Sequence, residues 1–193
     1  MASEEENNVL GKALAGGFVA LTLAATAWAQ IAPDAARPNA PNLTPSKPGS
    51  TMTPVQRVES APQGTLKDAY TDDNADIVEQ GHKLFFNFGC NGCHGGNGGG
   101  GMCPPLINDV WVYDGDDDTL FRLVTLGSIA LQAKGYTRKG HENVVAPMPP
   151  FGGIIPTEDD LWKVLAFIRS AYNGSPSHKY GNPPAVAEPT NDE

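Results

Sequence analysis

The sequence predicts an all-α domain in which helices at both ends enclose a middle part made largely of loops. Two stretches indicate the helices, residues 76–88 and 158–172, because their apolar residues recur every three or four positions. The loops are indicated by 22 glycines and 17 prolines, together about a fifth of the 193 residues and more than average usage. This length, with 40% apolar residues, is enough for one domain with its own core.

The first predicted helix runs from Asp76 to Phe88 and leads directly into Cys90. Its start is acidic, and one face is apolar, as in a helix packed on a core. Gly81 belongs to that apolar face. We expect it to let this helix cross the last helix closely, because no side chain separates the two backbones; a helix glycine without a special role is the alternative.

Two further helices are predicted downstream. A short one, Thr119–Leu126, follows an acidic turn at Asp114–Asp118, and residues 128–156 look irregular. The last helix is the clearest of all. Thr157 is a suitable N-cap, the three acids after it complement the helix dipole, and an apolar stripe continues to Tyr172.

Composition divides the chain into four parts. The second and fourth parts are rich in proline and lack apolar periodicity, which is typical of extended surface segments. The predicted parts are a signal peptide or N-terminal anchor (1–29), a Pro-rich extended arm (30–65), the folded domain (66–174) and a Pro-rich tail (175–193).

The signal peptide is predicted from the apolar run Ala13–Ala29, which ends in the small-x-small pattern that signal peptidase cuts, here before Gln30. The segment before this run is acidic, with a single Lys12, whereas export signals are basic there. An uncleaved membrane anchor and a buried core helix are the alternatives.

The net charge of the chain is −9. Removal of residues 1–29 takes away three Glu and one Lys, which leaves 19 acids against 12 bases, or −7. Such a surface repels nucleic acid and lipid head groups and favours a basic protein partner. Plain solubility is the alternative explanation of the charge.

Cys90, Cys93 and His94 form a C-x-x-C-H motif, which is typical of covalent haem attachment. Two thiols three residues apart can reach two vinyl groups on one porphyrin edge, and the next residue then places its imidazole under the iron. Export is consistent with this interpretation, because c-type haem is attached outside the cytoplasm. The sequence therefore predicts one covalent haem c with His94 as an axial ligand.

The alternative uses of the cysteines are a disulfide, a redox dithiol and a zinc site. Zinc needs about two more nearby ligands, and the remaining candidates, Cys103, His82, His141 and His178, form no paired motif. A thioredoxin-type dithiol opens a helix after a strand, whereas here a helix precedes the motif and a glycine-rich stretch follows.

Met148 is the candidate for the second axial ligand, because a methionine sulfur fills the remaining coordination position of the iron and raises its reduction potential. It lies in a proline-lined loop, Ala-Pro-Met-Pro-Pro-Phe, just before the last helix. A core methionine is the alternative role. The rival ligands are Met102, which is too close to the motif to cross the haem, His141 in a charged stretch that looks solvated, and His82 on the first helix.

The loop after the motif holds two more candidates. Pro104 or its neighbour offers a carbonyl that can accept the proton on the other ring nitrogen of His94 and so fix the ring. Cys103 is an odd thiol in an exported protein, and we interpret it as a packed, buried side chain. A haem-ligand role and an intermolecular disulfide are the alternatives.

Residues 75–173 resemble class I cytochromes c, whose fold wraps three or more helices around a haem. Four segments resemble, more narrowly, the cytochrome c-L-like electron acceptors of periplasmic PQQ-dependent methanol dehydrogenases, those of the lanthanide-dependent enzyme above all. They are Gly-Gly-Met-Cys-Pro-Pro-Leu (100–106), Asn-Asp-Val-Trp-Val-Tyr (108–113), Met-Pro-Pro-Phe-Gly-Gly (148–153) and Leu-Trp-Lys-Val-Leu-Ala-Phe-Ile-Arg (161–169). Residues 128–146 are longer than the matching part of many class I cytochromes.

The resemblance implies a periplasmic electron carrier rather than an enzyme. It would accept single electrons from a PQQ-dependent alcohol (methanol) dehydrogenase and pass them to a further cytochrome or an oxidase. Contact with a membrane is expected only if residues 13–29 stay uncleaved. The alternatives are a membrane-tethered cytochrome c module of a respiratory oxidase and a haem enzyme or gas sensor, which would need an open iron position.

Overall fold

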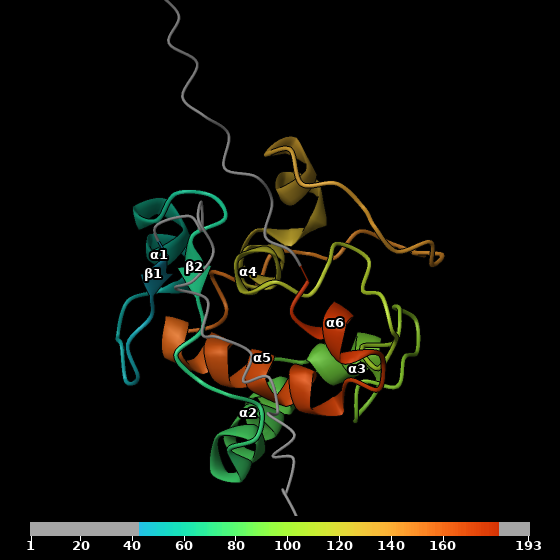
Figure 1. Cartoon of the computed structure of the whole chain (residues 1–193), viewed down its shortest axis with the longest axis horizontal. Helices are drawn as coiled ribbons and strands as arrows, with labels where there is room; N and C mark the ends of the chain where they lie inside the picture. The colour runs from blue at the N-terminus through green and yellow to red at the C-terminus, as the bar shows by residue number, and fades with distance from the viewer. Residues whose placement is uncertain (1–42, 182–193) are drawn as a thin grey trace, which may run out of the picture. The chain divides into compact units, whose positions relative to one another are not determined.

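A computed structural model describes residues 43–181 (Figure 1), so the predicted signal peptide and cleavage point lie outside the described residues. This part is mainly helical and includes one short parallel pair of strands. The elements in chain order are β1 (Thr44–Pro45), α1 (Pro54–Ser60), β2 (Leu66–Lys67), α2 (Ala75–Asn87), α3 (Cys90–His94), α4 (Asp117–Ala133), α5 (Glu158–Ala171) and α6 (Pro176–Lys179). No helix within residues 43–181 has the length and apolar character needed to cross a bilayer.

The first and last predicted helices, α2 and α5, cross closely (Figure 1). A Cβ atom at Gly81 would collide with the backbone carbonyl oxygen of Lys163 and lie 3.1 Å from the Cβ of Phe167. Only glycine fits there, so the predicted close crossing is confirmed. Next to the crossing, the rings of Phe85 and Phe167 pack with centroids 5.1 Å apart. The predicted cap is also present, since Thr157 accepts from the amide of Asp160 at 3.1 Å.

Helix α4 is longer than predicted. The prediction ended it at Leu126, but helical structure continues to Ala133 after a break at Gly127, where φ is 75°. A glycine with a positive φ is a common helix end, but here the chain continues as a helix beyond it. The chain turns helical again because Leu131 is completely buried, in a small second cluster with two tyrosines. The prediction of irregular structure from residue 128 is therefore wrong for 128–133.

The predicted extended arm is wrong for residues 43–65, which fold against the helices. Thr53 and Gln56 form a reciprocal capping box that starts α1. Arg57 of this helix pairs with Glu158 at 3.1 Å, and the indole of Trp162 donates to Ser46 at 2.7 Å. Proline at the first turn of α1 is compatible with a helix, so a high proline content did not imply an extended chain here.

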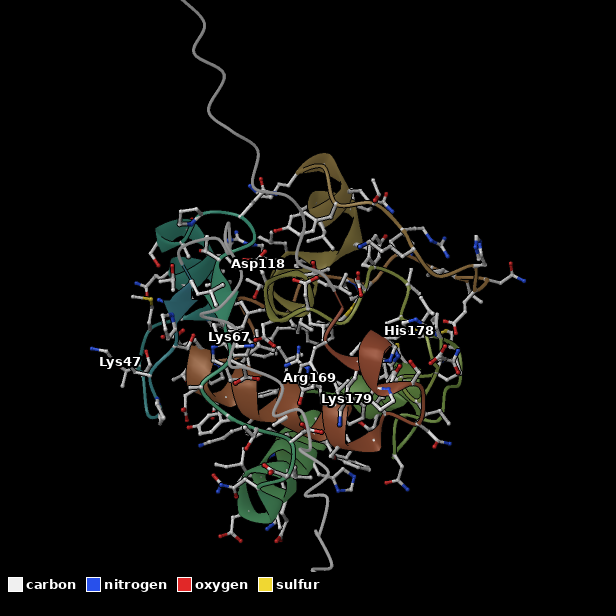
Figure 2. The ribbon with its side chains drawn as sticks, viewed as in Figure 1. Lys47, Lys67, Asp118, Arg169, His178 and Lys179 are labelled. Carbon is white, nitrogen blue, oxygen red and sulfur yellow. The ribbon has the colours of Figure 1, made fainter. Side chains whose placement is uncertain are left out.

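The predicted tail also begins inside the fold. Residues 175–181 include α6, and His178 on this helix lies 2.9 Å from a carboxylate oxygen of Asp109. Lys179 pairs with Asp72, which lies before α2. Figure 2 shows both side chains on α6, close to the end of α5. The folded domain therefore extends beyond the predicted boundary at residue 174.

Buried ion pairs join β2, α4 and α5. Asp117 accepts from Lys67 at 2.9 Å and from Arg169 at 2.6 Å, and only 3% of the Arg169 side chain is exposed. Asp118 is bound by both Arg122 and the phenol of Tyr136. Figure 2 shows Lys67 and Arg169 directed into the space between these elements, whereas Lys47 lies at the periphery. Such pairs need all their partners, because a buried charge left alone is costly.

Candidate functional site

A cavity of about 320 Å³ lies among α2, α3, α4, α5 and the loops that join them. Its lining is mostly apolar, with core residues such as Phe85, Leu120 and Leu165. Two sides of this cavity carry the predicted site residues. We call α2, α3 and loop 95–106 the motif wall, and α4 with residues 147–153 the methionine wall.

Helix α3 carries the C-x-x-C-H motif on the motif wall. Gly89, with a φ of 78°, lets the chain leave α2 and start α3 within one residue. Cys90 is buried and lines the cavity, and burial raises the pKa of its thiol to about 11. Cys93 is half-buried, one helical turn later, and His94 again lines the cavity. The motif thus presents a thiol and an imidazole to the same space.

The His94 ring is oriented by the following loop. Its Nδ1 lies 2.9 Å from the carbonyl oxygen of Pro104, and a carbonyl can only accept, so Nδ1 is the protonated nitrogen. The hydrogen bond expected from the sequence is thus present. Burial lowers the pKa of His94, which favours the neutral ring, and Nε2 keeps its lone pair for a metal.

The glycine-rich loop folds back on α3 and holds Pro104 in place. The amide of Gly100 donates to the carbonyl of His94 at 2.8 Å, and the amide of Cys103 donates to that of Cys93 at 3.1 Å. Gly95 has a φ of 75°, and a Cβ there would lie only 2.6 Å from the carbonyl oxygen of Gly100. Glycine is therefore required for the turn that positions the partner of His94.

Met148 lies on the methionine wall and lines the same cavity as His94. Its backbone is tied to Ser128, the first residue after the break in α4. The amide of Met148 donates to the hydroxyl of Ser128, and the amide of Ser128 donates to the carbonyl of Met148, both at 3.0 Å. Gly127 is needed for this contact, since a Cβ there would lie 2.7 Å from the Met148 carbonyl oxygen.

The rival ligands do not line the cavity. Met102 is 59% exposed, and His141 is exposed as expected. His82 is half-buried rather than a plain surface residue, because its ring stacks on Phe167 with centroids 4.4 Å apart. Residues 43–181 contain no cluster of three or more His, Cys, Asp or Glu side chains suited to a metal ion.

Cys103 lines the cavity and is half-buried, which is less burial than the packed, buried thiol that the sequence predicts. Partial burial, with the neighbouring Cys93 thiol as a lesser cause, raises the pKa of Cys103 to about 11. The thiol is therefore protonated at neutral pH and is a weak nucleophile.

The geometry is that of a site for a large apolar group with a metal at its centre. A thiol pair and a neutral imidazole stand on one wall, a thioether stands on the other, and apolar side chains lie between them. These donors fit a haem, since sulfur and imidazole ligands suit its iron and thiols suit covalent attachment.

Comparison with known proteins gives the class. Residues 78–171 match the family model of cytochrome c. This segment is a cytochrome c domain of the class I c type, which carries covalently attached haem c. It is an electron carrier and not an enzyme. The predicted fold class is thereby confirmed.

Among the solved structures similar to the chain is cytochrome CL from the marine methylotrophic bacterium Methylophaga aminisulfidivorans MPT. The two sequences are 23% identical, the TM-score is 0.43, and the match covers 67% of this chain and 75% of that chain. No curated protein matches the sequence.

Sequence reasoning missed the polar residues of the cavity. Tyr113, Gln132, Arg138 and Glu142 all line it, and Arg138 does so from a charged stretch that is largely exposed, as the sequence indicated. Nothing in their spacing marks them, because they come from three separate segments. The unusual length of residues 128–146 was the only available signal.

Proposed function

We propose that Cys90 and Cys93 hold the haem through thioether bonds and that His94 and Met148 are the axial ligands of its iron. One observation carries this proposal: His94 and Met148 come from segments 54 positions apart in the sequence, yet both line one apolar cavity. When bound, the haem supplies an iron that takes up and releases one electron.

The chain's own residues have three tasks in this proposal. Pro104 keeps His94 in the tautomer that binds through Nε2. Met148, held by Ser128, would be the second ligand of the iron and would exclude small molecules from it. The apolar lining excludes water, which disfavours the more highly charged ferric state and raises the reduction potential.

The ligand assignment is tested by absorption spectroscopy of the oxidised holoprotein. Wild type should show the weak far-red band of methionine sulfur bound to ferric iron, and Met148→Ala should lose it. Met102→Ala is the matched control, because Met102 is exposed and does not line the cavity. A band that survives in Met148→Ala would refute the assignment.

We further propose that the protein works in the periplasm as the electron acceptor of a PQQ-dependent methanol or alcohol dehydrogenase, and that it passes electrons to a further cytochrome or an oxidase. The support is the amino-acid sequence of the loops at 100–106, 108–113 and 148–153, which resembles the sequence of cytochrome c-L-like acceptors. The charge of −7 after removal of residues 1–29 favours a basic docking partner.

The partner is tested by mixing oxidised cytochrome with the purified dehydrogenase. Methanol should bring about haem reduction, and the rate should fall as salt is added, because the charges that steer docking are screened. The same mixture without methanol is the control. Absence of reduction at every salt concentration would exclude this partner while leaving the haem site unaffected.

The second candidate is a cytochrome c module tethered to the membrane beside a respiratory oxidase. The run Ala13–Ala29 favours this candidate, because its seventeen residues just reach the lower limit of length for a membrane-spanning helix. Mature N-terminal sequencing separates the candidates. Gln30 as the first residue supports the free periplasmic protein, and an intact run supports the tether.

A further inference from the structure

His82 on α2 is not among the proposed thiol and axial ligands, yet neighbouring side chains fix the orientation of its ring. The ring stacks on that of Phe167 from α5, with centroids 4.4 Å apart and an interplanar angle of 25°. It also meets the ring of Phe86 edge-on, with centroids 5.1 Å apart. Stacked and edge-on contacts are the two favourable arrangements of such rings, so packing at the crossing of α2 and α5 orients this imidazole.

The oriented ring makes a hydrogen bond to the glycine-rich loop. Its Nε2 atom lies 3.1 Å from the carbonyl oxygen of Gly96, and a carbonyl can only accept, so Nε2 carries the proton and donates. Gly96 lies two positions after His94. A Cβ atom at Gly96 would lie 3.2 Å from the Cζ atom of Phe86, so the loop passes close to α2 here. Helix α2 therefore holds the start of the loop through one hydrogen bond and one packing contact.

The loop itself has few side chains with which to hold its conformation. Six of the seven residues at 95–101 are glycine, which loses more conformational entropy on folding than any other residue and offers no side chain for packing. The amide of Leu106 donates to the carbonyl of Gly98 at 2.7 Å, which ties the glycine-rich part to the part that contains Pro104. A shift at Gly96 is therefore passed on to the segment around Pro104.

We propose that His82 is a positioning residue for His94. By holding Gly96, the His82 ring fixes the glycine-rich loop. This loop places the carbonyl oxygen of Pro104 2.9 Å from the Nδ1 atom of His94. Through Phe167, the packing of α2 on α5 is thereby coupled to the orientation of the His94 imidazole. The inference rests on the proposed role of His94 as an axial ligand and makes no assumption about the partner.

The hydrogen bond from His94 to Pro104 has two measurable consequences. A proton shared with a carbonyl exchanges slowly with water, because the bond must open before exchange can occur. The same bond makes the imidazole a stronger base towards the metal, and a more basic ligand favours ferric over ferrous iron. Loosening of the loop should therefore speed the exchange of the His94 Nδ1 proton and raise the reduction potential.

The test compares two uncharged variants with the wild-type holoprotein. His82→Phe keeps an aromatic ring on Phe167 but has no donor for Gly96. Proton NMR of the oxidised protein in D2O should show its His94 Nδ1 proton exchanging about threefold faster, the factor expected from loss of one exposed, neutral hydrogen bond. Redox titration should give a higher midpoint potential. His82→Gln supplies an amide donor in place of Nε2 and should return both values towards those of wild type.

Lys83→Gln is the matched control, because Lys83 is the next residue of α2 and its side chain is 68% exposed. It should change neither value. The wild-type spectrum tests the ligand assignment separately, since only an imidazole bound to the iron gives its ring proton a strong paramagnetic shift. If His82→Phe yields no holoprotein, His82→Leu takes its place, because leucine also lacks the donor. Wild-type exchange and potential in the variant without a donor, even with lowered stability, would overturn the positioning role and leave the axial ligands unaffected.

Discussion

The two walls of the cavity are specified over very different sequence distances. The motif wall is local: Cys90, Cys93, His94 and the carbonyl of Pro104 fall within fifteen consecutive residues. The methionine wall is assembled from residues twenty apart, since Ser128 at the break of α4 holds Met148. A local arrangement survives damage elsewhere, whereas a wall made by a loop against a helix depends on every contact between them.

The largest loss of stability is expected at the crossing of α2 and α5. Helix α5 packs against α2 of the motif wall and against α4 of the methionine wall. Gly81→Leu should destabilise the holoprotein by more than about 3 kcal/mol, because the added side chain meets the backbone of Lys163. Thermal unfolding and haem content check this. Gly153→Ala is the control, since a Cβ there has no neighbour within 4 Å. Normal haem content and stability in Gly81→Leu would contradict the crossing as a requirement.

The second prediction tests the methionine wall without changing the motif wall. Gly127→Val should cost about 3 kcal/mol, because the residue has a φ of 75° and its Cβ would meet the backbone of residues 148–150. Its specific consequence is loss of the sulfur-to-iron band while the haem stays covalently attached, since the motif wall is not touched. A variant that keeps the band would show that the methionine wall tolerates a shift at Gly127.

These two glycines also show what could be predicted from sequence. The role of Gly81 could be predicted because it lies on the apolar face of a helix with regularly spaced apolar residues, and the structure confirms the close crossing there. The role of Gly127 was not predicted, because it depends on Met148, a contact that no local pattern reveals. The same limit applies to Arg57: its buried partner Glu158 lies 101 positions away, so a Pro-rich arm was predicted where a folded segment exists.

The third prediction concerns pH and two buried acids, Asp68 after β2 and Asp116 at the start of α4. Burial raises the pKa of Asp68 to about 7 and that of Asp116, the N-cap of α4, to about 6. The folded state therefore holds protons on these two carboxyl groups that the unfolded state has already lost, so their contribution to stability is largest near pH 4 and falls as the pH rises to 7. We expect a fall of more than about 1 kcal/mol over this range, measured as the unfolding temperature.

Asp68→Asn sharpens this prediction, because an amide cannot ionise. The variant should lose most of the decrease in stability above pH 5, although the weakened pairing with Arg169 lowers its stability at every pH. Asp76→Asn is the control, since Asp76 is exposed in the first turn of α2. An unchanged pH profile in Asp68→Asn would mean that other groups carry the effect.

The smallest effect is expected from the single hydrogen bond that ties Met148 to α4. Ser128→Ala removes the acceptor of the Met148 amide, a loss of about 1 kcal/mol. Because the reciprocal bond from the Ser128 amide to the Met148 carbonyl remains, the sulfur-to-iron band should persist but disappear at a lower temperature than in wild type. Ser170→Ala, on the exposed side of α5, is the matched control. If the band melts together with global unfolding in both variants, the methionine wall is as cooperative as the motif wall, and the contrast between them fails.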